Sequence, residues 1–290
     1  MFARIIAVVF PVFFLTGVGA WIAWRYKPDF SEANRLTMDV FVPALIFGAL
    51  AGKEFHIAQY WQLALGMFIA TFACGAAGWL LARVQRQDGR TWAPLVMFGN
   101  SANLAIPVAM LAFGDKMLQP AVVLFMVSVT LHFGFGSWLL NREARVTTLW
   151  RIPPVAAMLA GLVVSLLGIH LWEPAVDSIQ LLGQVAIPMN ILALGVRLVG
   201  MDLGSWRDGL VAGTVRPLAG MAISWCVARL IGLHDWETAL LIVFGAMPPA
   251  VLNFIFAERY RQEPQRVASM VLIGNLMSLV FLPLALWWVL

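Results

Sequence analysis

Polar side chains and a proline stand together within an otherwise apolar stretch, residues 92–113. Asn100, Ser101 and Asn103 can each donate a hydrogen bond to an anion, and none of them is charged. Pro107 lacks a backbone donor and clashes with the carbonyl four residues earlier, so the helix should unwind near Asn103. Unwound backbone at membrane depth needs protein or a water-filled cavity around it. The stretch therefore predicts a substrate site; the alternative is that these side chains only satisfy backbone groups that Pro107 frees.

A second apolar stretch, residues 237–257, carries a similar combination. Pro248 and Pro249 stand in its middle and are followed by Asn253, so this helix should be interrupted near Pro248. The half-helices that begin at such breaks present free N–H groups and positive dipole ends, which favour an anion. The two stretches predict a carboxylate site made of neutral side chains and backbone, where the interrupted helices cross near the membrane midplane.

Four other polar residues lie within apolar stretches. Arg216 is a candidate for binding the substrate anion or for a core counter-charge, and the other three are candidates for counter-charge or coupling. Arg216 lies about eight residues, or roughly 12 Å, inside its helix, where a charge usually faces the interior and meets a partner. The alternative is an anchor that reaches back to the membrane surface. Asp39 lies near a helix end, which predicts an ion pair with Arg197 or Arg216 rather than a proton relay. His132 is either a protonatable coupling group or a hydrogen-bonded core histidine, and Asn275 is the fourth candidate.

The elements that must position these residues are membrane spans. The chain has 290 residues, of which 61% are hydrophobic and 12% charged, and this composition excludes a soluble globular domain. Apolar runs near the roughly 20 residues needed to cross a bilayer recur along the whole length. We count ten spans with short connections, at about residues 4–24, 35–52, 61–82, 92–113, 119–140, 153–171, 177–200, 208–231, 237–257 and 267–289.

Lys and Arg are unequally distributed between the two ends of these spans. One end carries Arg25, Lys27, Arg35, Arg83, Arg86, Arg90, Arg142, Arg145, Arg151, Arg197, Arg207, Arg259, Arg261 and Arg266. The other end carries Arg4, Lys53, Lys116 and Arg229. Because loops rich in Lys and Arg stay in the cytoplasm, the first end is predicted to be cytoplasmic. An even number of spans then places both termini in the periplasm, in a multi-pass protein of the cell inner membrane.

The sequence predicts an internal repeat with five spans in each half, residues 1–145 and 146–290. An odd number of spans per half turns the second half upside down, which is the inverted-repeat plan of many secondary transporters, with the site between the halves. The positions that coincide at an offset of 145 residues are Pro43 with Pro188, Trp61 with Trp206, Gly75 with Gly220 and Thr130 with Asn275.

Five segments match, in order, motifs that are typical of one family. They are Val42–Phe47, Gly99–Pro107, Ala186–Gly195, Ala246–Tyr260 and Ala268–Leu284. With them the sequence resembles the auxin efflux carrier family of secondary transporters, although Ala102 and Ala105 replace glycines usual there and Asn103 replaces an aromatic or apolar residue. The resemblance implies a fold like that of bile-acid:sodium symporters, with a scaffold and a core that carries two crossed, broken helices. It also implies carboxylate substrates, as for malate and malonate permeases.

Taken together, the sequence predicts an all-α polytopic transporter of small mono- or dicarboxylates or auxin-like acids. Alternating access would take place around the crossing of the fourth and ninth spans. The alternative is a sodium-coupled organic-anion symporter of the related fold. An enzyme is not expected, because the spans lack acidic metal motifs, a Ser–His pair and a Cys/His cluster. We expect no metal, cofactor or nucleic acid; the expected partners are a small organic anion and the lipid bilayer, and a homodimer is left open.

Overall fold

The computed structural model describes residues 2–51, 57–141, 150–199 and 204–290, and their regular elements are helices. The first half contains α1 (Phe2–Tyr26), α2 (Ser31–Leu36), η1 (Thr37–Phe41), α3 (Val42–Leu50), η2 (Ile57–Tyr60), α4 (Trp61–Val84), α5 (Gly89–Met97), η3 (Ser101–Ala105), α6 (Ile106–Phe113), η4 (Asp115–Met117), α7 (Leu118–Leu131), η5 (His132–Gly136) and α8 (Ser137–Leu140). The second half contains α9 (Pro153–Leu166), α10 (Glu173–Leu198), α11 (Trp206–Ile231), α12 (Asp235–Gly245), α13 (Val251–Arg259) and α14 (Pro264–Val289).

Seven helical stretches of the described chain are long and apolar enough to cross a membrane. They are Phe2–Tyr26, Ser31–Leu50, Trp61–Val84, Asp115–Leu140, Glu173–Leu198, Trp206–Ile231 and Pro264–Val289. These stretches correspond to seven of the ten expected spans, while the fourth and ninth are each divided into shorter helices and the sixth is the 14-residue α9. The protein is therefore an all-helical polytopic membrane protein; the total of ten spans and the inverted relation of the halves remain predictions. Lys53, Arg142 and Arg145, which enter the topology prediction, lie outside the described residues.

Proline and glycine mark several helix boundaries. Pro153, Pro174 and Pro264 stand in the first turns of α9, α10 and α14, where a missing N–H removes no intrahelical bond. Gly232 ends α11 in the left-handed conformation (φ 70°), which glycine adopts without a steric penalty. The sequence thus sets where these helices begin and end.

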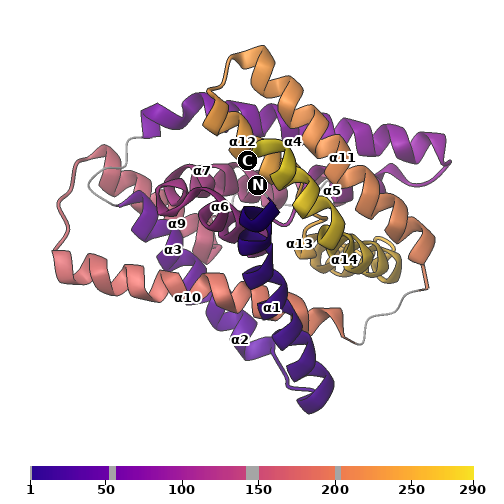
Figure 1. Ribbon diagram of the computed structural model, residues 1–290, viewed down its shortest axis with the longest axis horizontal. Helices are drawn as coiled ribbons and strands as arrows, with labels where there is room; N and C mark the ends of the chain where they lie inside the picture. The colour runs from indigo at the N-terminus through magenta and orange to yellow at the C-terminus, as the bar shows by residue number, and fades with distance from the viewer. Residues whose placement is uncertain (1, 52–56, 142–149, 200–203) are drawn as a thin grey trace.

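The helices pack as two groups, which lie in the lower and upper parts of Figure 1. The scaffold group contains α1, α2, η1, α3, α9 and α10, and α10 packs against both α1 and α3. The core group contains α4 to α7 and α11 to α14, and α11 packs against α4, α12 and α14. Small residues allow the closest approaches: a Cβ on Gly19 would collide with the Leu192 carbonyl, and a Cβ on Gly195 would collide with the Thr16 carbonyl. In the scaffold group, α1 and α10 are thus closely packed.

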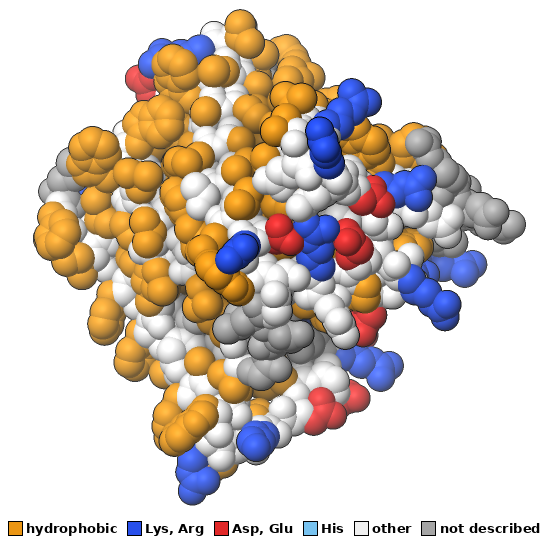
Figure 2. Space-filling view, turned by 90° about the vertical axis from the view of Figure 1, so that its right-hand side faces the viewer, with side chains coloured by type: hydrophobic (Ala, Val, Ile, Leu, Met, Phe, Trp, Pro, Cys, Tyr) orange, Lys and Arg blue, Asp and Glu red, His pale blue; other side chains and the backbone are white. Residues whose placement is uncertain are grey.

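The surface is strongly apolar. Figure 2 shows hydrophobic side chains over much of one face, with Lys, Arg, Asp and Glu gathered over another part of it. Long helices expose large apolar side chains: Leu80 of α4, Leu230 of α11 and Val280 of α14 are each more than 60% exposed. Such a surface would aggregate in water, whereas lipid tails cover it at no cost.

The predicted fourth and ninth spans are interrupted, and their breaks touch. Phe98–Asn100 is a non-helical segment, extended at Phe98, between α5 and η3, and residues 246–250 separate α12 from α13. The Asn100 N–H donates to the Pro248 carbonyl at 2.8 Å, and the Ala250 N–H donates to the Phe98 carbonyl at 2.9 Å. This short antiparallel pairing satisfies backbone groups that the breaks would leave unpaired at membrane depth.

The interruption near Pro248 confirms the sequence prediction, but the position of the first break does not. The chain leaves the helix at Phe98–Asn100, before Asn103, and Asn103 itself lies in the helical turn η3. This turn is a π-helix, in which the Ile106 N–H bonds the Ser101 carbonyl five residues back. The wider turn takes up the clash between the Pro107 ring and the preceding turn, so the proline does not break the helix there. The same solution occurs in η1, which ends two residues before Pro43.

Candidate functional site

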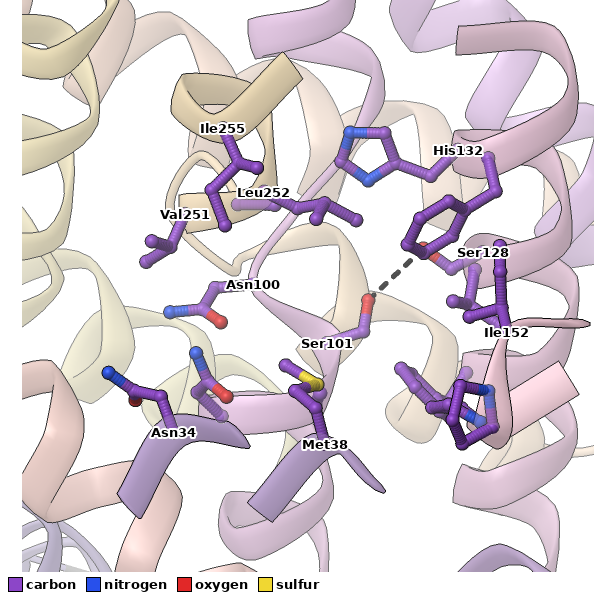
Figure 3. Close-up of a pocket in the computed structure, with 18 of the residues that line it drawn as sticks. Asn34, Met38, Asn100, Ser101, Ser128, His132, Ile152, Val251, Leu252 and Ile255 are labelled. Carbon is purple, nitrogen blue, oxygen red and sulfur yellow. Dashed lines mark hydrogen bonds between the residues drawn. The ribbon is translucent and has the colours of Figure 1, made fainter. Parts of the chain in front are cut away.

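A pocket of about 490 Å³ lies between the scaffold and core groups. The scaffold group contributes residues of α2, η1, α10 and the start of α9, and the core group contributes the breaks, η3, α7 and α13. Figure 3 shows Asn34 and Asn100 on one side of this space and Ser128 on the other. The polar lining residues are Ser31, Asn34, Arg35, Asp39, Asn100, Ser101, Asn103, Ser128, His132 and Arg197.

Two helix N-termini face this pocket, one from each interrupted span. Asn100 and Ser101 at the start of η3 line it, and so do Ala250 and Val251 at the start of α13. The first N–H groups of a helix have no intrahelical acceptor, and the helix dipole adds partial positive charge there. The pocket therefore offers an anion two positive helix ends without a metal ion.

Two asparagines near the crossing serve the backbone. The Asn253 amide donates to the Phe98 carbonyl at 3.3 Å. The Asn275 amide donates to the carbonyls of Pro249 (3.1 Å) and Val271 (2.8 Å), while its oxygen accepts from the Asn100 amide at 3.0 Å. Neither Asn253 nor Asn275 lines the pocket. For these two residues, the structure favours the alternative in which an amide satisfies freed backbone groups.

Asn103 differs from them. Its side chain is only 6% exposed, lines the pocket and makes no hydrogen bond to a described residue. Ser101 is intermediate, because its hydroxyl lies 3.2 Å from the Gly99 carbonyl and 3.3 Å from the Ser128 hydroxyl (Figure 3). A buried amide without a protein partner is costly unless something else bonds it, so Asn103 is the polar side chain best placed to meet a ligand.

Arg216 lies behind the breaks rather than in the pocket. Its side chain is buried and its Nη1 donates to the Gly245 carbonyl at 2.8 Å, at the C-terminal end of α12. A Cβ on Gly99 would collide with its Nη2, so the guanidinium also fills the space beside the first break. A buried side chain does not reach a membrane surface, so the anchor alternative is wrong. The geometry is that of a cation at the negative end of a half-helix.

The predicted partner of Asp39 is wrong. Asp39 pairs with Arg35 one turn earlier at 3.6 Å, and at the pocket the Arg35 side chain is largely exposed and that of Asp39 about half exposed. Arg197 instead donates through Nη2 to the Asn34 oxygen at 3.0 Å. The reason is helical geometry, since Arg35 and Asp39 are four residues apart and share one helix face.

His132 lies at the core side of the pocket. Its ring stacks on Phe98 with centroids 4.0 Å apart and an interplanar angle of 7°, and it makes a T-shaped contact with Phe256 with centroids 5.1 Å apart. Its Nε2 is buried and has no hydrogen-bond partner among the described residues. Both sequence alternatives for His132, a protonatable coupling group and a hydrogen-bonded core histidine, therefore stay predictions.

The structure thus brings together only part of the predicted site. Asn100, Ser101, Asn103, Asp39 and His132 line the pocket. The predicted residues that do not line it are Pro107, Arg216, Pro248, Asn253 and Asn275. Sequence reasoning missed Asn34, Ser128 and the pocket position of Arg197, because each stands near a span end or in an ordinary apolar helix. Within the described ranges, no group of three or more His, Cys, Asp and Glu side chains could hold a metal ion.

Comparison with known proteins adds a second line of information. A family model described as "Membrane transport protein" matches residues 4–145 and again residues 143–287. An uncharacterized transporter of Methanocaldococcus jannaschii is 23% identical over 279 residues, covering 89% of this chain and 88% of that protein. Another uncharacterized transporter, from Methanothermobacter thermautotrophicus, is 25% identical over 278 residues with the same coverage. Auxin efflux carrier component 3a of Oryza sativa subsp. japonica is 29% identical over 136 residues, covering 44% of this chain and 22% of that protein.

Proposed function

The chain belongs to the membrane transport protein family that includes the auxin efflux carriers, and on this premise we propose that it carries small organic anions. The transported acid binds with its carboxylate at the two breaks. The scaffold and core groups then move against each other and expose the pocket alternately to the two sides of the membrane. Transport is secondary active, driven by a gradient rather than by nucleotide hydrolysis.

One observation supports this proposal above the others: two half-helix N-termini line one pocket between two groups of helices. Helix N-termini bind carboxylates through N–H groups and dipole charge. The buried amide of Asn103 supplies a further donor that no described residue uses.

The direct test is ligand binding by the purified protein. Its thermal unfolding is measured with a panel of monocarboxylates, dicarboxylates and arylacetic acids such as indoleacetic acid. Each acid is paired with its uncharged primary amide. An acid at 100 times its Kd should stabilise the folded protein by about 2.7 kcal/mol, whereas the amide should have little effect because it carries no negative charge.

Uptake into proteoliposomes then tests transport and its driving force. Uptake of the best-binding acid should be saturable and should respond to a proton gradient, a sodium gradient or neither. A dependence on sodium would favour the sodium-coupled alternative. The proposal is wrong if no acid in the panel stabilises the protein or enters the vesicles.

A further inference from the structure

The pocket contains one positive charge that no described carboxylate balances. Three charged side chains line it, those of Arg35, Asp39 and Arg197. Arg35 and Asp39 pair with each other at 3.6 Å. Within the described residues, Arg197 makes no ion pair, and the one hydrogen bond it makes there goes to the neutral oxygen of Asn34. Among the described lining residues, the net charge of the pocket therefore comes from Arg197.

Arg197 has spare donors. A guanidinium carries five N–H groups in a planar fork, and a single one of them bonds a described residue. The side chain is half-buried in the last turn of α10, where a cation also favours the helix dipole. Its bond, however, goes to α2 and not to a carbonyl of α10. If Arg197 only capped its own helix, it would bond a carbonyl of α10 and not the side chain of Asn34.

Arg197 lines the same pocket as the breaks of the two interrupted spans. The Asn34 side chain that it holds lies on the same side of the pocket as Asn100 in Figure 3. Asn100 directly precedes η3 and lines the same pocket as Arg197. The N-termini of the half-helices and the guanidinium therefore share one cavity. Apolar side chains such as Met38 and Ile255 form much of the remaining lining. The pocket thus has two places that attract an anion, with apolar surface around them.

We infer that Arg197 determines specificity by binding a second carboxylate of the transported acid, while the first carboxylate lies at the helix ends. This inference rests on the proposed function and narrows it to acids with two carboxylates on one molecule. Arginine suits the role because its fork can bind both oxygens of a carboxylate at once. A monocarboxylate would leave the positive charge of Arg197 unanswered in the closed pocket.

The test compares each diacid with its half-amide, in which one carboxylate is replaced by a neutral group of similar size. Diacids of three to six carbons and their half-amides are measured by thermal stabilisation and by isothermal titration. The parent protein should prefer its best diacid over the half-amide by roughly 10- to 100-fold. Arg197→Gln should remove this preference and leave the affinity for the half-amide within about twofold.

Arg229→Gln is the control, because it removes the same formal charge from an exposed position outside the pocket. It should keep the preference for the diacid. If Arg197→Gln does not fold, Arg197→Lys replaces it; this variant keeps the charge without the fork, so its preference should fall several-fold.

Other outcomes separate the two proposals. Equal binding of diacid and half-amide by the parent overturns the role of Arg197 while the carboxylate site stands. An equal loss of both ligands in Arg197→Gln, or an unchanged preference in Arg197→Lys used as its replacement, also overturns it. If the parent binds no acid at all, the proposed function itself is wrong.

Discussion

Asn103 is the residue whose side chain has the clearest opportunity to bind a ligand. Its amide lines the pocket and bonds no described residue. Asn103→Leu keeps similar size and removes both donors, so acid affinity should fall by roughly 5- to 150-fold, or about 1–3 kcal/mol. The measurement is acid-induced thermal stabilisation. Asn190→Leu, which removes an equally buried amide of α10 outside the pocket, should leave affinity unchanged. Equal affinities in Asn103→Leu and the parent would place the carboxylate elsewhere.

Asn253 should behave in the opposite way. Its amide bonds the Phe98 carbonyl across the two breaks and does not line the pocket. Asn253→Leu leaves that carbonyl without its side-chain donor, so the free energy of unfolding should fall by about 1–3 kcal/mol. Unfolding without ligand is the measurement. A variant as stable as the parent but unable to bind acid would show that Asn253 contacts the substrate, as the sequence prediction had it.

Residue types in the sequence predicted which polar side chains lie near the crossing, but they did not predict the role of each side chain. Asn100, Asn103 and Asn253 all stand near prolines, and nothing local distinguishes them. Their roles depend on which carbonyls the second break brings within reach, and that is set by contacts between residues about 150 positions apart. Arg216 shows the same limit: its depth predicted an interior partner, but the partner is a helix-end carbonyl of α12, which the sequence does not mark.

Single helices and their neighbours depend on glycine at their closest approaches. The backbones of α11 and α12 touch where a Cβ on Gly220 would collide with the Gly245 carbonyl. Gly220→Ala should therefore push α12 away and lower the free energy of unfolding by about 1–3 kcal/mol. Gly17→Ala in α1 is the control, since a Cβ there meets nothing within 4 Å and alanine is the better helix former. Equal stability of the two variants in thermal unfolding would contradict this account.

The breaks of the fourth and ninth spans could be predicted because their residues are poor helix formers at membrane depth. The exact position of the first break could not. Proline geometry alone places it near Asn103, but the chain absorbs Pro107 in the π-turn η3 and opens at Phe98–Asn100 instead. The non-helical segment is favoured there because it finds the carbonyl of Pro248 and the N–H of Ala250. Tertiary pairing thus decides the position.

For the molecule as a whole, the distribution of Lys and Arg predicts orientation in the membrane. The arginine-rich end should lie in the cytoplasm and both termini in the periplasm. Fusions of a reporter that fluoresces only in the cytoplasm should stay dark at either terminus. A fusion in the connection between α4 and α5, at residues 85–88, should be bright. Two bright terminal fusions would reverse the orientation.

Alternating access requires contacts between the scaffold and core groups that close one side and break when it opens. Arg4 makes such a contact: its Nη2 donates to the Ala112 carbonyl at 3.0 Å, joining α1 to the C-terminal end of α6. The charge pattern places Arg4 at the predicted periplasmic end, whereas Arg35 and Arg197 of the pocket belong to the opposite end. The contact should therefore help to keep the periplasmic side closed while the pocket faces the cytoplasm.

Arg4→Gln should weaken this closure and shift the population toward the outward-open state. A charged group at a helix C-terminus contributes about 0.3–1 kcal/mol, so the ratio of the two states should change by roughly two- to fivefold. The shift is measured with a cysteine at Met38, which lines the pocket, after Cys74 and Cys226 are replaced by alanine. A membrane-impermeant maleimide added from the periplasmic side should label this cysteine faster in Arg4→Gln.

Arg229→Gln is the control. It removes an exposed arginine at the same predicted end, one that lies over Trp225 of its own helix, and it should leave the labelling rate unchanged. Because labelling reports access to the pocket rather than stability, an unchanged rate in Arg4→Gln would show that this contact does not hold the periplasmic side closed.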